Sequence, residues 1–157
     1  MKIISGGQVG ADIAGLRVAQ RLGYETGGWM PKGFRTLSGD HPEYAEMYGI
    51  LETADGGYPV RTRLNVKTAT VTLRYAHNFH SYGEKATARY LRSMNKPHLD
   101  VDINYVEKIL SPSPHYVSRW LAVYEPEIIN IAGNANIDIE PLVEEHLEKT
   151  LQMFAQL

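Results

Sequence analysis

Residues 6–10, Gly-Gly-Gln-Val-Gly, have the composition of a turn that binds an anion. The apolar residues Ile3 and Ile4 precede this turn, and a helical pattern begins at Ala11. In open α/β sheets, a turn between a strand and a helix presents unpaired backbone N–H groups and the positive end of the helix dipole. Glycine has no Cβ, so a ligand can approach such a backbone closely. Neither G-x-x-x-x-G-K-[ST] nor a complete G-x-G-x-x-G is present, so a tight turn without a ligand is the alternative.

Three polar side chains further along the sequence could contact the same ligand. Lys32 stands between Pro31 and Gly33, in a turn that could direct its ammonium group towards an anion. Arg61 and Asn65 are four residues apart and are therefore neighbours on one helix face. A solvated surface lysine and a surface pair on the helix are the alternative interpretations.

A second candidate turn contains Ser81, Tyr82 and Gly83 at the start of another helical pattern. Its hydroxyl and backbone N–H groups fit a second phosphate site, or simply an N-cap serine. Asp12 falls in the first turn of the first helix, where a carboxylate complements the helix dipole or binds ribose hydroxyls or a cation. Trp29 could stack on a base, or belong to the core.

Other chemistries find little support in the sequence. His77 and His80 have the spacing of metal ligands, but neither cysteine nor an H-E-x-x-H motif accompanies them, so we expect no metal ion. The absence of cysteine excludes a disulfide, a thiol nucleophile and a cysteine-based zinc site. We find no set of Ser, His and Asp residues that would meet at one edge of a folded sheet, so we assign no catalytic residue. We also expect no cofactor.

Short β-type segments alternate with helical patterns along the chain, which predicts an α/β, Rossmann-like fold. We expect a mainly parallel sheet of about five strands with helices on both faces. The predicted strands are residues 2–5, 24–28, 70–75, 97–101 and 127–131. The predicted helices are residues 11–22, 59–68, 83–95, 114–124 and 139–154. Residues 29–57 have weak periodicity and predict a long functional loop with one helical turn near residues 43–48.

Polar or glycine-rich clusters follow most of the predicted strands. They are residues 5–10, 27–33, 76–83 and 132–136. Because the carboxyl ends of parallel strands lie at one edge of a sheet, these clusters should converge on a ligand pocket above that edge.

The bulk composition limits the possible function classes. The chain has 157 residues, 43% of them hydrophobic and 22% charged, as expected for one domain over residues 1–157. A net charge of −2 argues against a nucleic-acid partner, because binding of that kind depends on neutralising phosphates. No apolar run approaches the ~20 residues that cross a bilayer, so we expect no membrane contact. The first predicted strand begins directly after Met1, and we therefore expect a cytoplasmic location.

Five segments of the sequence together resemble the family of molybdenum carrier proteins, within the SLOG group of Rossmann-like domains. They are residues 4–12 (Ile-Ser-Gly-Gly-Gln-Val-Gly-Ala-Asp), residues 27–33 (Gly-Gly-Trp-Met-Pro-Lys-Gly), Arg61-Thr62 with Asn65-Val66, Ser81-Tyr82-Gly83 with Thr87, and residues 130–134 (Asn-Ile-Ala-Gly-Asn). The resemblance spans almost the whole chain and implies a ligand pocket above the sheet and self-association. The expected ligand-binding residues are Gly6, Gly7, Gln8, Gly10, Asp12, Trp29, Lys32, Arg61, Asn65, Ser81, Tyr82, Gly83, Thr87, Gly133 and Asn134.

The sequence departs from the family pattern at several positions. Met30 stands where cysteine is common, and Ile13 where arginine is common. Residues 68–70, Thr-Ala-Thr, replace a stretch that usually carries two aspartates. The phosphoribohydrolases of the SLOG group have Gly-Thr-x-x-Glu at the second phosphate helix, whereas here Glu84 follows the glycine and Thr87 takes the place of the glutamate. We expect Glu84, displaced by almost one helical turn, to point elsewhere.

SLOG domains bind or process nucleotide-derived molecules, and three functions follow from the resemblance. The leading hypothesis is binding, without turnover, of a phosphate-bearing nucleotide derivative of the ADP-ribose or cyclic-nucleotide kind. The protein would then act as a sensor, or as a sponge for an immune signal in a virus. The alternatives are a phosphoribohydrolase-like enzyme and a carrier of molybdenum cofactor or molybdate. The expected partners are this small molecule and further copies of the chain, with four aromatic residues as contact surface or as core. They are Tyr58, Tyr82, Tyr116 and Trp120.

Overall fold

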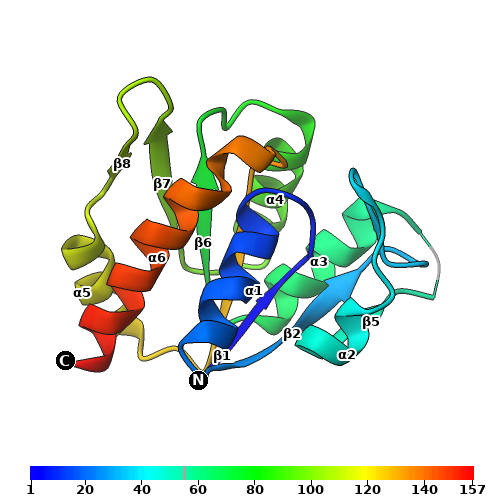
Figure 1. The fold of residues 1–157 in the computed structure, drawn as a ribbon, viewed down its shortest axis with the longest axis horizontal. Coiled ribbons are helices and arrows are strands. Elements are labelled where there is room, and N and C mark those ends of the chain that lie inside the picture. The colour runs from blue at the N-terminus through cyan, green and yellow to red at the C-terminus, as the bar shows by residue number, and fades with distance from the viewer. Residues whose placement is uncertain (55) are drawn as a thin grey trace.

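The structure, a computed structural model, describes residues 1–54 and 56–157. Its main element is a seven-stranded sheet in the order β5-β2-β1-β9-β6-β7-β8 (Figure 1). The strands are β1 (Lys2–Ser5), β2 (Glu25–Met30), β5 (Ile50–Glu52), β6 (Val71–Ala76), β7 (His98–Asn104), β8 (Ile109–Ser111) and β9 (Ile128–Gly133). All neighbouring strands are parallel except β7 and β8, which are antiparallel. The predicted Rossmann-like α/β fold is confirmed.

Helices cover both faces of the sheet, as expected. In Figure 1, α1 (Ala11–Arg21), α5 (Pro114–Tyr124) and α6 (Glu140–Ala155) lie on one face, and α3 (Tyr58–Thr68) and α4 (Tyr82–Ser93) lie on the other. The short helices are α2 (Tyr44–Tyr48) and the 3₁₀ turn η1 (Ile137–Ile139), and a small hairpin joins β3 (Arg35–Thr36) to β4 (Gly39–Asp40).

The sequence pattern of α1 and α6 explains where the larger core lies. Ala11, Ala14 and Val18 follow the 3.6-residue period of a helix and are fully buried against the sheet. Val143 and Leu147 of α6 join the same cluster. A smaller cluster beside α2 includes Ile13, Leu16, Met30, Tyr48 and Ile50.

The expected number of strands was too low, since the sheet has seven strands and not about five. The two additional strands, β5 and β8, are short edge strands of three residues each. Strands this short show no clear alternation of apolar and polar residues, and their position depends on pairing with β2 and β7.

The prediction of one long loop over residues 29–57 was also wrong, although its helical turn near residues 43–48 is confirmed as α2. This segment contains the end of β2, the β3–β4 hairpin, α2 and β5, while residue 55 lies outside the described residues. Tyr48 and Ile50 are buried from this segment. Its glycine and proline content obscures short elements that are held by packing on α1 and β2.

Candidate functional site

A cavity of about 550 Å³ opens at the carboxyl edge of the central strands β1, β9 and β6. The β1–α1 turn, α3, the β6–α4 turn and the end of β9 enclose it, and this volume is typical of small-molecule sites. Three of the four clusters predicted to converge, within residues 5–10, 76–83 and 132–136, line this cavity, whereas no residue of 27–33 does. The predicted residues that line the cavity are Gly6, Gln8, Asp12, Arg61, Asn65, Ser81, Tyr82, Gly83, Thr87, Gly133 and Asn134.

The N–H groups of the β1–α1 turn are already paired with acceptors of the protein. The Gly7 N–H donates to Ser5 Oγ at 3.2 Å, and the Gln8 N–H donates to Asp12 Oδ2 at 3.3 Å. The Val9 N–H donates to Gln8 Oε1 at 3.0 Å. The Gly10 N–H donates to Glu140 Oε2 at 2.9 Å, from the start of α6. The N–H groups of residues 7–10 are therefore not free to bind an anion, although the glycine pattern of this turn predicts an anion-binding site.

Gly10 shows why this turn needs glycine for structural reasons. Its φ of 92° lies in the region that favours glycine, and a Cβ there would overlap the carbonyl oxygen of Asn134. The adjacent Ala11 N–H donates to that same oxygen at 3.2 Å. Gly10 thus joins the start of α1 to the segment after β9 and does not line the cavity.

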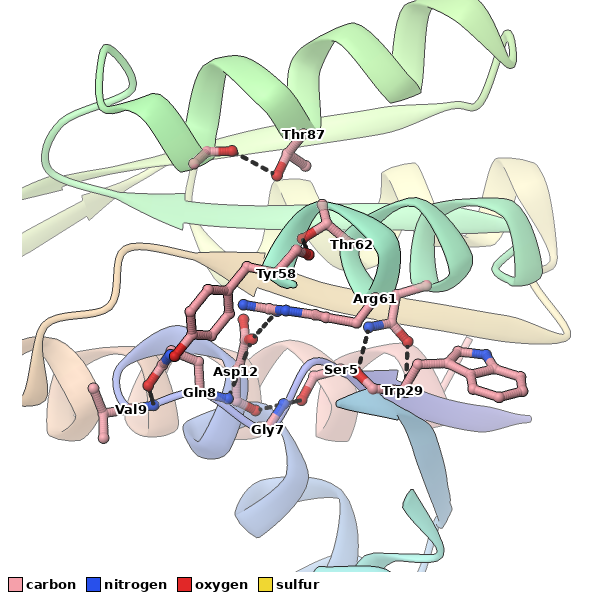
Figure 2. Close-up of polar contacts among 12 residues, drawn as sticks. Ser5, Gly7, Gln8, Val9, Asp12, Trp29, Tyr58, Arg61, Thr62 and Thr87 are labelled. Carbon is pink, nitrogen blue, oxygen red and sulfur yellow. Dashed lines mark hydrogen bonds and ion pairs between the residues drawn. The ribbon is translucent and has the colours of Figure 1, made fainter. Parts of the chain in front are cut away.

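An ion pair between Asp12 and Arg61 forms one wall of the cavity (Figure 2). Arg61 Nη1 lies 3.0 Å from Asp12 Oδ2, and the two side chains are only 13% and 6% exposed. The guanidinium also lies 5.3 Å from the centroid of the Tyr58 ring. Burial raises the pKa of Asp12 above its ordinary value, while the Arg61 charge opposes that shift. A Cβ on Gly6 would overlap this guanidinium, so Gly6 leaves the space that Arg61 occupies.

Arg61 retains hydrogen-bonding capacity beyond this pair. Its Nε is buried and has no hydrogen-bond partner among the described residues. Its Nη2 forms no hydrogen bond with these residues either and is not among the buried atoms, so an anion in the cavity can bind Nη2 without breaking the Nη1 bond to Asp12.

Two asparagines that line the cavity hold the backbone together. Asn65 accepts the Trp29 N–H at 3.0 Å and donates to the Trp29 carbonyl at 3.1 Å, which fixes α3 to β2. Asn134 Oδ1 accepts the N–H groups of His77 and Asn78 at 2.9 and 3.1 Å. Asn134 Nδ2 donates to the Asn78 carbonyl at 2.9 Å. Asn134 thereby sets the path of the β6–α4 turn.

The β6–α4 turn ends in donors that remain free. Ser81 is the N-cap of α4, and its hydroxyl accepts the Glu84 N–H at 3.3 Å. Among the residues that the structure describes, the N–H groups of Tyr82 and Gly83 have no hydrogen-bond partner. Both residues line the cavity, so the positive end of the α4 dipole faces it.

The expectation that Glu84 points elsewhere was wrong, because Glu84 lines the cavity and is only 4% exposed. Burial raises its pKa to about 7, and the charges of Asp12 and Asp100 add to this effect. The charges of Arg74 and Arg61 lower the pKa. A carboxyl that titrates near neutral pH can exchange a proton with a bound ligand.

Thr87, on the same helix, donates its hydroxyl to the Gly83 carbonyl at 3.0 Å (Figure 2). The Thr87 oxygen keeps its acceptor capacity towards the cavity that it lines.

The predicted residues outside this cavity are Gly7, Gly10, Trp29 and Lys32. Lys32 lines an adjoining cavity of about 390 Å³ together with Arg35, and Tyr58 lines both cavities. Gly7 approaches Met30 closely. Trp29 contributes its backbone to the bond with Asn65, and its side chain does not line the main cavity.

Sequence reasoning missed Tyr58, Glu84 and Glu140 as residues that shape the site. The Ser-x-x-Glu spacing from Ser81 to Glu84 is a recognisable helix-capping signal that could have drawn attention to Glu84. The bond from Gly10 to Glu140 joins residues far apart in sequence, and no local pattern indicates it.

No group of three or more His, Asp or Glu side chains suited to a metal ion occurs among residues 1–54 and 56–157. Over the same residues, none of the helices combines the length and apolar character that a membrane span requires.

Comparisons with known proteins agree with this fold. The circularly permuted YpsA SLOG family matches the chain over residues 3–155. The fold is similar to a crystal structure of a putative molybdenum carrier protein from Syntrophus aciditrophicus SB, with a TM-score of 0.78 and 30% sequence identity. That similarity covers 98% of this chain and 93% of the other. A search of curated proteins finds no match.

Proposed function

The chain belongs to the circularly permuted YpsA SLOG family and is a nucleotide-ligand-binding domain, and from this premise we propose that it binds a phosphate-bearing nucleotide derivative. The ligand is of the ADP-ribose or cyclic-nucleotide kind and is held without turnover, as by a sensor or a sponge. One observation carries the proposal. The free N–H groups of Tyr82 and Gly83 face the same cavity as the guanidinium of Arg61.

The chemistry of these donors fits a phosphate group. A helix N-terminus with unpaired N–H groups favours an anion, and a guanidinium adds a directional charged donor. The buried pair with Asp12 holds Arg61 in place, which lowers the conformational cost of binding. The cavity volume of about 550 Å³ leaves room for the rest of a nucleotide.

The test is calorimetry with AMP, ADP-ribose and cyclic ADP-ribose on the wild-type protein and on Arg61→Lys. Lysine keeps a charge beside Asp12 but cannot donate several hydrogen bonds in one plane. We expect binding to weaken by about 1.5–3 kcal/mol. Arg63→Ala is the matched control, because Arg63 lies on the same helix but is exposed and lines neither cavity. Failure of the wild-type protein to bind any of the three nucleotides, with binding of molybdate instead, would replace this proposal with the carrier alternative.

A second candidate function is hydrolysis of the N-glycosidic bond of a nucleotide, and the position of Glu84 favours it. Cleavage develops oxocarbenium-like charge, which a nearby carboxyl group stabilises. Glu84 lies in the cavity with a pKa raised to about 7. The two functions separate when the protein is incubated with each nucleotide, denatured, and its released small molecules are analysed. Intact nucleotide supports binding alone, whereas free base and sugar phosphate that disappear with Glu84→Ala establish an enzyme.

We also propose a cytoplasmic protein that self-associates, which rests on the family resemblance. Tyr82 is 77% exposed and Tyr116 is 56% exposed, so both are accessible for a contact between copies. Trp120 instead packs against the main core. Light scattering at micromolar concentration tests this point, and a monomeric mass would contradict it.

A further inference from the structure

The start of α4 contains a helix-capping pattern that is only half formed. In Ser-x-x-Glu capping, the serine hydroxyl accepts the glutamate N–H, and the glutamate carboxylate accepts the serine N–H in return. The first bond exists here, from the Glu84 N–H to Ser81 Oγ at 3.3 Å. Within the described residues the second does not, because the hydrogen bonds of Glu84 involve only its backbone. Glu84 lines the cavity instead.

The two arginines near Glu84 already form ion pairs with other carboxylates. Arg74 binds Asp100 through two bonds of 2.7 and 2.6 Å, and its remaining Nη1 donates to the Glu84 carbonyl at 3.0 Å. The Arg74 guanidinium is also 5.0 Å from the centroid of the Phe79 ring. Arg61 directs its Nη1 to Asp12. Glu84 thus has a carboxyl group without a hydrogen-bond partner in this part of the chain, and a molecule bound in the cavity that Glu84 lines can supply the donors.

The ribose of a nucleotide is the ligand group that best supplies these donors. Glu84 lies in the first turn of α4, next to the free N–H groups of Tyr82 and Gly83 that we assign to the phosphate. In a nucleotide the ribose hydroxyls are close to the phosphate, and the base is further away. A divalent cation would need several oxygen ligands, and the described residues hold no such cluster.

Resting on the proposed function, we propose that Glu84 accepts hydrogen bonds from the ribose hydroxyls of the ligand and makes the site selective for ribonucleotides over 2′-deoxyribonucleotides. A site built to bind a hydroxyl rejects the analogue that lacks it, because a buried polar group is then left unpaired.

The experiment is calorimetry at pH 8 with AMP, GMP, CMP and UMP, each compared with its 2′-deoxy counterpart. We expect the ribonucleotide that binds wild-type protein to bind about ten- to a hundredfold more tightly than its deoxy form. In Glu84→Gln this ratio should fall to about threefold or less, because a neutral amide accepts a hydroxyl hydrogen bond more weakly. Glu46→Gln is the control, since Glu46 is exposed on α2 and lines neither cavity.

The wild-type ratio tests the inference even if the variant folds poorly. Equal binding of ribo and deoxy forms by wild-type protein would overturn the role of Glu84 and leave the proposed function intact. A ratio that Glu84→Gln retains in full would also overturn it. Absence of binding for all of these mononucleotides would overturn the inference, whereas the proposed function fails only if ADP-ribose and cyclic ADP-ribose do not bind either.

Discussion

The β1–α1 turn and the β6–α4 turn occupy equivalent positions at the carboxyl edge of the sheet, but they differ in what their N–H groups bind. In the first, Asp12 and Glu140 accept the N–H groups of Gln8 and Gly10, so carboxylates of the protein take the place of an anionic ligand. In the second, the N–H groups of Tyr82 and Gly83 are free among the described residues. A glycine-rich sequence therefore identifies a tight turn, whereas the neighbouring side chains decide whether that turn can bind an anion.

The carboxyl groups of the two turns differ in the same way. Asp12 is buried, but it has a guanidinium and a backbone N–H group as partners. Glu84 is buried without a side-chain partner in the described part of the chain. We infer that the first carboxylate serves the fold and the second serves the ligand, and their substitutions should affect stability in opposite directions.

The largest effect expected is the loss of stability in Asp12→Ala. This substitution leaves Arg61 as a buried charge without its partner, which typically costs about 3–5 kcal/mol. Urea denaturation of the ligand-free protein measures the change in the free energy of unfolding, with the exposed Asp40→Ala as control. A loss below about 1 kcal/mol, similar to that of surface substitutions, would mean that the first turn does not depend on its internal carboxylate.

Glu84 should instead make the folded protein less stable as the pH rises. Its pKa is raised from 4.5 to about 7 by folding, so the folded protein binds this proton more tightly than the unfolded chain. The free energy of unfolding therefore falls as the pH rises from 4.5 to 7, by about 3 kcal/mol from this group alone.

Glu84→Gln removes this contribution, so the difference in unfolding free energy between variant and wild type isolates it from other titrating groups. We expect that difference to grow in favour of the variant from pH 4.5 to pH 7 and to stay constant above pH 7. Denaturation curves at several pH values measure it. A variant that is less stable than wild type at pH 8 would show that Glu84 serves the fold, as Asp12 does.

Glu140→Ala tests whether the second carboxylate that binds the first turn also stabilises the fold. It removes the acceptor of the Gly10 N–H and the partner of Arg17 at the start of α6. We expect a loss of about 1.5–3 kcal/mol, the range for hydrogen bonds to charged groups. Glu144→Ala is the matched control, because Glu144 also pairs with Arg17 but does not bind the turn. Equal losses in the two variants would locate the effect in the ion pairs and not in the turn.

The smallest effect on ligand binding is expected for Lys32, which the sequence predicted to contact the same ligand as Arg61. Lys32 is exposed and lines the adjoining cavity, so Lys32→Ala should weaken nucleotide binding by less than about 1 kcal/mol. Calorimetry with the nucleotide that binds best measures this change. A loss as large as that of Arg61→Lys would extend the binding site into the second cavity.

The sequence was sufficient for the framework of the fold and for the sheet edge at which the candidate site lies. The periodic burial of Ala11, Ala14 and Val18 followed from their spacing, and the polar ends of the parallel strands converge as that topology requires. The short edge strand β5 depends on pairing and packing with distant elements, which leave little local signal.

The sequence could not predict which of the two turns has free N–H groups or which carboxyl group is left without a hydrogen-bond partner among the described residues. The hydrogen bond between Gly10 and Glu140 joins residues far apart in the sequence, so the pairing of the Gly10 N–H group is visible only in the folded structure. The sequence left Ser81 as either a phosphate site or an N-cap and placed Glu84 away from the ligand, because the burial of Glu84 beside the cavity comes from tertiary packing.

The most direct test is a ¹H–¹⁵N NMR titration of the wild-type protein with AMP and ADP-ribose, because it observes the N–H groups of both turns at once. We predict that the amide signals of Tyr82 and Gly83 shift as nucleotide is added, while those of Val9 and Gly10 stay in place. Shifts confined to Val9 and Gly10, or no shift in either turn, would contradict the claim that the open β6–α4 turn binds the phosphate.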